Sequence, residues 1–195
     1  MSLPSDESWC SRRTALQIAR QCWQLQDRDM LALLQRMRGL GLVPMHGPEH
    51  HGLVAAIVLT AYRNAGGELA EQAVTETVLR ANSIPGGSCG KLGICGAAVG
   101  LGTALATLLY SSPLDGQKRA LVQQAVCQAT ESIASLNAPR CCQRECALTL
   151  RVAAELSEKI LPVRLTAKQS YDCVQFELCD ECVGQRCLLH PEHHG

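Results

Sequence analysis

Apolar residues recur along the chain with the spacing of helices, and glycine, proline and short polar residues separate the runs. This pattern predicts helices and gives no firm signal for a strand. Ser11 is expected to cap a helix that ends near Leu25, and Asp27 to cap a second helix that ends at Arg38. Further helices are predicted over residues 48–64, 68–81, 117–136, 139–160 and 166–178.

The stretch from Leu92 to Leu114 has no charged residue and is long enough to cross a bilayer. It is rich in Gly, Ala and Thr and lacks basic flanks or paired aromatic belts, which favours a buried helix over a membrane span. Gly96 and Gly100 share one face and would allow a neighbouring backbone to approach closely. We therefore expect an all-α fold, a compact helical bundle around this Gly/Ala-rich central helix.

Composition narrows the functional classes. A chain of 195 residues can form one domain without disulfides, and we expect a helical domain over 1–165 with an irregular Cys/His-rich segment, 166–195, packed on it. Equal numbers of acidic and basic residues and few aromatics argue against nucleic acid as a partner.

Residues 1–13 lack the apolar segment of a secretory signal, so we expect a cytoplasmic protein. The chain has twelve cysteines, and in such a compartment clustered cysteines are more often metal ligands or catalytic groups than disulfides.

The first cysteine cluster is PGGSCGKLGICGAA, residues 85–98, which places Cys89 and Cys95 on a glycine loop. Gly87 and Gly90 are expected to let main-chain amides approach a bound group. The loop leads into a helix N-terminus, whose dipole favours thiolates or cluster sulfides. The phosphate-loop pattern is absent, and a tight loop with buried cysteines is the alternative.

The second cluster is PRCCQREC, residues 139–146, at the start of an expected helix. It contributes Cys141, Cys142 and Cys146 as candidate metal ligands. Arg140 and Arg144 are expected to lower the thiolate pKa values and to offset the negative charge of a cluster. The alternative is that these cysteines are ordinary core residues.

The third cluster lies in the tail and offers a whole ligand set: Cys173, Cys179, Cys182 and Cys187. Its single C-x2-C matches neither a zinc ribbon nor the bacterial ferredoxin pattern. We favour iron–sulfur over zinc here, and zinc over no metal. The histidines that follow, His190, His193 and His194, are expected to form a solvated tail.

The segment HGPEHH, residues 46–51, does not match H-E-x-x-H, which excludes that kind of metalloprotease site. His46 or His50 is expected to act as an acid or base, or as a hydrogen-bonding group, beside the glycine loop. A local hydrogen bond at the helix entry is the alternative. The remaining cysteines have no partners nearby in sequence and are predicted to be packing residues: Cys10, Cys22 and Cys127.

HGPEHH, PGGSCGKLGICGAA, PRCCQREC and the Cys-rich ending occur in this order between about Met45 and Cys187. This set resembles an uncharacterised prokaryotic cysteine-rich domain family that occurs alone or appended to radical-SAM enzymes or SAM-dependent methyltransferases. The resemblance implies a stand-alone protein that binds a metal or a cluster, and it brings no established reaction. A redox, methyltransferase or radical-SAM protein is the expected partner. The functional residues that the resemblance implies are His46, Cys89, Cys95, Cys141, Cys142 and the terminal cysteines.

The glycine and cysteine loop is also similar, with different spacing, to the cluster-binding helical domain of iron–sulfur L-serine dehydratases and cysteine desulfidases. The leading hypothesis is therefore an iron–sulfur protein. It places a 4Fe-4S cluster between Cys89, Cys95 and the cysteines of 141–146, with a second site in the tail. Three-thiol ligation would leave an iron open to a small-molecule substrate and indicate a lyase or sulfur transferase; full ligation would indicate an electron carrier.

Two other classes stay open. The first is a zinc-stabilised scaffold or interaction module in which the tail cysteines form a closed tetrahedral site. The second is a thiol-dependent transferase in which Cys89 is the nucleophile and His46 or His50 is the base. The large number of clustered thiols argues against the second class, because one nucleophile needs at most one resolving partner.

Overall fold

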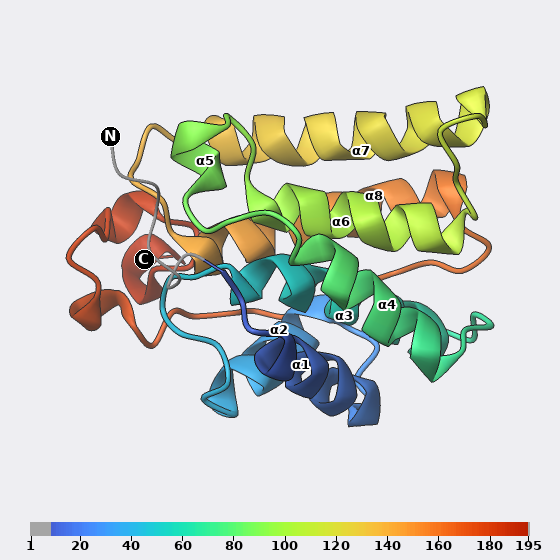
Figure 1. The fold of residues 1–195 in the computed structure, drawn as a ribbon. Coiled ribbons are helices and arrows are strands. Elements are labelled where there is room, and N and C mark those ends of the chain that lie inside the picture. Colours follow the sequence, from blue (N-terminus) through green and yellow to red (C-terminus); the bar gives the residue numbers. More distant parts are fainter. Residues whose placement is uncertain (1–8, 195) are drawn as a thin grey trace.

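The computed structural model describes residues 9–194, and within them the protein is all-helical (Figure 1). Three 3-10 turns, η2 (Phe176–Leu178), η3 (Gly184–Arg186) and η4 (Pro191–His194), follow the α-helices. The predicted all-α class is confirmed. The α-helices in this part of the chain are α1 (Arg12–Gln24), α2 (Met30–Gly39), α3 (Glu49–Asn64), α4 (Glu71–Ala81), α5 (Ser88–Lys91), α6 (Gly96–Leu108), α7 (Gly116–Ala134) and α8 (Cys142–Ile160).

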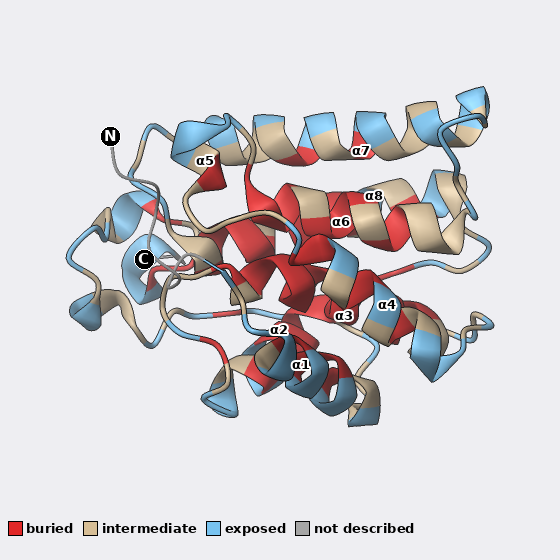
Figure 2. Cartoon of the chain, in the orientation of Figure 1, coloured by how far each residue is buried: buried red, intermediate tan, exposed pale blue. Residues whose placement is uncertain are grey.

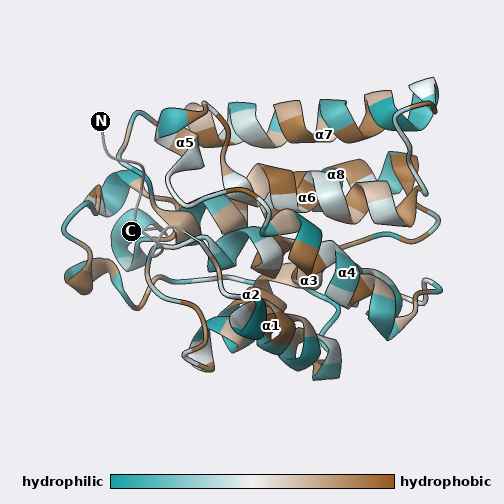
Figure 3. Cartoon of the chain, in the orientation of Figure 1, coloured by the Kyte–Doolittle hydropathy of each residue, from teal (hydrophilic) through white to brown (hydrophobic). Residues whose placement is uncertain are grey.

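The core is built around α3 and α6. Every residue of α3 from His50 to Tyr62 is buried, because the helix contacts α1, α2, α4, α6 and α8. The Gly/Ala-rich α6 packs between α3, α4, α7 and α8 and is predominantly apolar, whereas α7 mixes hydrophilic and hydrophobic residues (Figure 3). Helix α7 covers α6 and α8 from outside and buries Ala125 and Ala129 (Figure 2).

Helix boundaries follow the capping residues. Ser11 caps α1 as predicted, since its hydroxyl accepts the backbone N–H of Thr14 at 3.0 Å. The predicted cap at Asp27 is wrong, because Asp29 accepts the N–H groups that open α2 and Asp27 pairs with Arg36 at 2.8 Å. A tertiary contact fixes this start: the N–H of Met30, the first residue of α2, donates to a tail carbonyl, that of Thr166, at 2.8 Å.

Small residues on α6 allow the close packing that their spacing predicts. A Cβ at Gly100 would lie 2.3 Å from the carbonyl oxygen of His51, and a Cβ at Gly96 would lie 1.9 Å from the His51 ring. The helix is shorter than the uncharged run in the sequence. None of the helices in residues 9–194 combines the length and the apolar character that a membrane span requires.

The predicted helix over 166–178 is wrong. The chain there is irregular up to the turn η2, and its backbone groups bond to distant parts of the protein instead of to each other. The N–H of Lys168 donates to the carboxylate of Asp29 at 2.7 Å, and the N–H of Cys173 donates to the carbonyl of Leu189 at 2.7 Å. Buried Tyr171 anchors the segment to the core, so tertiary contacts override the local helical pattern.

Replacing Gly100 with alanine should destabilise the protein, because the new Cβ would press on backbone rather than on a side chain that can move. Overpacking of this kind costs about 1–3 kcal/mol, measurable as a lower midpoint in urea denaturation. Gly116→Ala at the start of α7 is the matched control, since a Cβ there meets nothing within 4 Å. Equal stability of the two variants would contradict the packing account.

Candidate metal centres

The glycine loop between α4 and α6 forms a short helix, α5, that the sequence did not predict. Gly87 precedes it with φ +80° and Gly93 follows it with φ +71°. Side chains other than glycine rarely adopt this left-handed backbone. Gly90 lies within α5 and does not adopt the left-handed backbone conformation. The two turns place Cys89 on α5 and Cys95 at the N-cap of α6.

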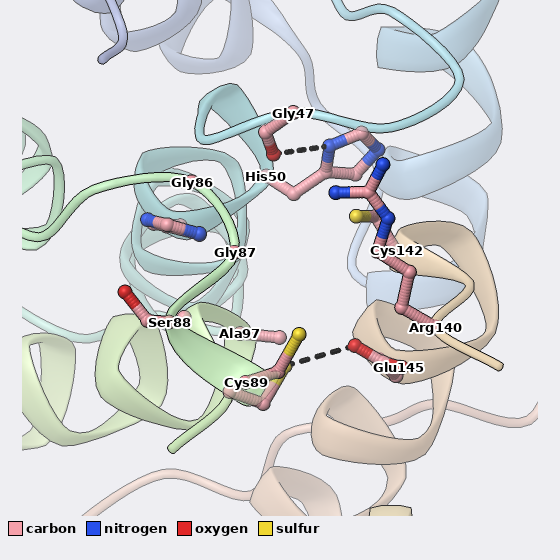
Figure 4. A pocket seen from close by; sticks show the side chains of 13 residues that line it. Gly47, His50, Gly86, Gly87, Ser88, Cys89, Ala97, Arg140, Cys142 and Glu145 are labelled. Carbon is pink, nitrogen blue, oxygen red and sulfur yellow. Dashed lines mark hydrogen bonds between the residues drawn. The ribbon is translucent and has the colours of Figure 1, made fainter. Parts of the chain in front are cut away.

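Cys89 and Cys95 face a pocket of about 390 Å³ that we call the inner pocket (Figure 4). Four segments meet there: the start of α3, the loop before α5, the start of α6 and the start of α8. Their side chains leave a small hollow, part of it open to solvent, whose wall combines several donor atoms with apolar surface. The chemically active lining residues are Cys89, Cys95, Cys142, Glu145, His50 and His51.

Glu145 is the buried carboxylate of the inner pocket. The thiol of Cys95 donates to its Oε2 at 3.0 Å, and the backbone N–H of Cys141 donates to its Oε1 at 3.1 Å. Sequence reasoning missed Glu145 as a site residue. Its position in the first turn of a helix, where an acidic side chain can reach back to a cap N–H, was the available signal.

The two adjacent cysteines at the start of α8 point into different pockets. Cys141 is the extended N-cap residue and Cys142 is the first helical residue, so their side chains leave the chain in different directions. Cys142 lines the inner pocket beside the Arg140 guanidinium (Figure 4). Cys146 is fully buried, with its Sγ 4.0 Å from the carbonyl oxygen of His50. The structure thus gathers Cys89, Cys95 and Cys142 and directs Cys141 elsewhere.

Cys141 faces a second hollow of about 380 Å³, which we call the tail pocket. All four cysteines of the C-terminal segment line it too, so five thiols surround one space. The wall between them is apolar, and the ring of His190 packs edge-on against Phe176 with centroids 4.7 Å apart. His190 is buried, so the expectation that it forms part of a solvated tail is wrong. The five thiols are those of Cys141, Cys173, Cys179, Cys182 and Cys187.

His46 lies beside the tail pocket and is not part of the inner pocket's lining. Its Nε2 is 3.6 Å from the Sγ of Cys179 and 3.6 Å from the carboxylate of Glu181. The three ligand atoms lie within 4.8 Å of one another, close enough for one cation. Sequence reasoning did not include Glu181, because acidic residues are common in exposed tails.

His50 is held from both sides of its ring. Its Nδ1 lies 3.1 Å from the carbonyl oxygen of Gly47, so it carries the proton, and Nε2 accepts from Arg38 at 3.2 Å. Burial, followed by the charge of Arg38, lowers the pKa of His50 to about 3. A neutral ring with both nitrogens engaged favours positioning the loop over acid–base catalysis, and the bond to Gly47 is the local hydrogen bond at the helix entry that the sequence analysis gave as the alternative.

Arg38 connects the pockets and had no signal in the sequence. Its guanidinium donates to the carbonyl of Val43 at 3.2 Å and to that of Pro44 at 2.6 Å. It also donates to the side chain of Gln175 in the tail. One cation therefore ties the loop that carries His46 and His50 to the segment that carries the tail cysteines.

All twelve cysteines, each within the described residues, are free thiols. Burial raises the pKa of Cys142 to about 11 despite the amide of Gly47. Burial is also the first cause of the raised pKa of Cys141, Cys95 and Cys146. Arg144 lowers the pKa of Cys141 and Arg140 lowers that of Cys142, as predicted, but burial outweighs both arginines and the net pKa of each thiol is raised. Several such thiolates can coexist only when a cation compensates their charge.

The two predicted arginines occupy different environments. Arg140 is exposed and lines the inner pocket. Arg144 is 2% exposed and lines the tail pocket. Its Nη2 donates to the carbonyl of Pro139 at 2.8 Å and lies 3.8 Å from Glu145. Its Nε has no acceptor among the described residues.

Fold and sites together define an all-α protein with two cysteine-lined pockets on either side of the start of α8. Over residues 18–190 the chain matches the model of DUF5714, a family of unknown function, and it belongs to that family. Searches of curated proteins and of solved structures gave no match. The expectation of an uncharacterised family is confirmed, and the function has to be argued from the pockets.

The pKa of His50 predicts a pH dependence. Because the folded pKa is about 3 and the ordinary value is 6.5, the unfolded chain binds the extra proton between these limits. The free energy of unfolding of the metal-free protein should fall as pH drops below 6.5, by about 1.4 kcal/mol per unit from this residue alone. His50→Gln should remove that part of the slope in urea denaturation series. Identical slopes would contradict the assignment of a neutral buried ring.

Proposed function

We propose that this protein binds two iron–sulfur clusters, one in each pocket, and that the inner cluster is a 4Fe-4S cluster held by Cys89, Cys95 and Cys142. The observation that carries the proposal is that cysteines from distant parts of the sequence line the same pockets. These three thiols come from three separate segments and face one hollow, while Cys141 joins four tail thiols around another. Cysteines that serve only as core residues fill space, because protein interiors are close-packed.

The spacing of the thiols supports clusters over single zinc ions. Four thiolates around one zinc ion, at Zn–S distances of about 2.3 Å, lie about 3.8 Å apart. Within residues 9–194, no three cysteine sulfurs lie mutually within 4.8 Å. A cluster holds its thiolates farther apart than one ion does, since each binds a different iron. Thiols that line a common pocket without forming a trio this close are consistent with that requirement.

The charges around the pockets also suit an anionic cluster. Arg144 is buried at the tail pocket with its Nε lacking an acceptor in the described structure, and thiolates or sulfides are acceptors. Arg140 stands at the inner pocket, beside Cys142. Cationic groups at both hollows would offset charge that burial otherwise makes costly. The thiol ligands and the cationic side chains around them therefore both favour an anionic cluster.

The inner pocket is lined by three thiols and one carboxylate, which would leave one iron of a 4Fe-4S cluster without a cysteine ligand. Such an iron supplies Lewis-acid chemistry to an oxygen or sulfur group of a small molecule. The role of Glu145 follows from its bond to Cys95: it receives the thiol proton as the metal enters. We propose a lyase or sulfur-transfer enzyme, with the five-thiol tail pocket holding a fully ligated redox or structural cluster.

Zinc is the second candidate, and the cluster of His46, Cys179 and Glu181 favours it. These are compact, mixed nitrogen, sulfur and oxygen donors of the kind that bind a single divalent ion. If zinc binds there, the tail pocket is a structural metal site that stabilises an interaction module. The thiol-transferase alternative is weakened, because His46 lies at Cys179 rather than in the inner pocket, and both nitrogens of His50 are engaged.

Anaerobic reconstitution with iron and sulfide tests the assignment. Two double variants, Cys89→Ser/Cys142→Ser and Cys179→Ser/Cys182→Ser, should each lose about half of the iron and acid-labile sulfide, because each removes two ligands from one pocket only. Cys127→Ser is the matched control, as Cys127 is exposed on α7 and lines neither pocket.

The same assays separate the candidates. Full iron and sulfide content in both double variants would overturn the cluster proposal. A colourless protein that contains zinc and no labile sulfide, and that loses zinc in the Cys179→Ser/Cys182→Ser variant, would establish the zinc alternative instead.

A further inference from the structure

A larger groove adjoins the inner pocket on its outer side. It lies between the loop around α5 and the C-terminal end of α7, and it encloses about 1270 Å³, part of it open to solvent. We call it the α7 groove. It shares five lining residues with the inner pocket, so the two spaces are neighbours with a common wall: Gly87, Cys89, Cys95, Arg140 and Glu145.

One wall of the α7 groove is apolar. Ile133 and Ala134 come from the last turn of α7, and Leu136 and Ala138 from the turn that leads to α8. These side chains give a ligand a surface for a short hydrocarbon chain, and they extend the groove away from the cysteines. Apolar contact of this kind stabilises a ligand in proportion to the area that it removes from water.

The α7 groove also has cationic lining residues. Lys91, Arg140 and Arg144 line the groove against a single acid, Glu145. That acid already accepts hydrogen bonds from Cys95 and from the N–H of Cys141. Lys91 and Arg140 are exposed, and neither takes part in an ion pair within the described residues. The groove thus offers uncommitted positive charge next to an apolar surface.

We propose that the α7 groove binds a small organic acid with a short apolar chain, whose carboxylate pairs with Arg140 and Lys91 and whose chain lies on Ile133 and Leu136. Because Arg140 also lines the inner pocket, this orientation places the carboxylate end of the ligand beside Cys89 and Cys95. The inference names the substrate class of the proposed inner site, and in that respect it rests on the proposed function.

The test uses three probes of equal chain length and different charge: hexanoate, 1-hexanol and hexylammonium. Binding to the full-length protein is measured by calorimetry, in the metal-free form and after anaerobic reconstitution. Hexanoate should bind about tenfold more tightly than hexanol, and hexylammonium more weakly than both, since one charge-assisted pair gives a difference of this order. Lengthening the acid from butanoate to hexanoate should raise affinity about two- to fourfold per methylene group.

Arg140→Gln should lower hexanoate affinity about five- to tenfold and leave hexanol binding unchanged. Arg119→Gln is the matched control, because Arg119 lies at the other end of α7, near Gln123, and outside the groove. Equal binding of hexanoate and hexanol, or no effect of Arg140→Gln, would overturn the proposal.

The iron and sulfide assays distinguish a failure of the groove proposal from a failure of the cluster proposal. Charge-selective hexanoate binding in a protein that takes up no iron would support the groove and refute the cluster. In a protein that holds its clusters, hexanoate should change the electron paramagnetic resonance signal that Cys89→Ser/Cys142→Ser abolishes. An unchanged signal at saturating hexanoate would overturn the placement of the ligand beside the inner site.

Discussion

The geometry of both pockets depends on the first turn of α8. An N-cap residue is extended and the next residue is helical, so two consecutive side chains diverge, and here they are the thiols of Cys141 and Cys142. Consecutive Cα atoms are about 3.8 Å apart, which makes this turn the shortest covalent connection between the two hollows. Glu145 stabilises this turn, because its carboxylate accepts hydrogen bonds from the N–H of Cys141 and from the thiol of Cys95.

Burial sets the chemical state of these groups. Burial raises the pKa of Cys95, of Cys142 and of the neighbouring Cys146, so the metal-free chain holds these three thiols protonated at neutral pH. A carboxylate and several thiolates cannot share such a space without a cation. On the proposed function, metal entry would therefore be coupled to proton release, and the hydrogen bond from Cys95 to Glu145 would give the first proton an acceptor.

Sequence patterns correctly predicted the structural features that local interactions determine. Ser11 caps its helix, Gly87 takes the left-handed backbone, and Gly100 permits a close backbone approach, because each effect depends on one residue and its neighbours. The failures arise from long-range contacts. Asp29 replaces Asp27 as a cap where the tail meets α2, and the tail loses its helical pattern to bonds with Asp29 and Leu189. Cys141 and Cys142 were assigned to one site, since spacing alone does not show where side chains diverge.

Arg38 makes the two pockets interdependent. It donates to Gln175 of the tail and to His50 at the inner pocket, so the position of one segment affects the other. The tail buries few large apolar side chains, and Tyr171 and Leu189 are its main anchors in the core. Metal binding among the five thiols of the tail pocket, four of them from the tail, would supply ordering free energy that hydrophobic burial does not. A tail ordered in this way would fix Gln175, hold Arg38 against His50, and keep the loop of Gly47 in the place where its amide faces Cys142.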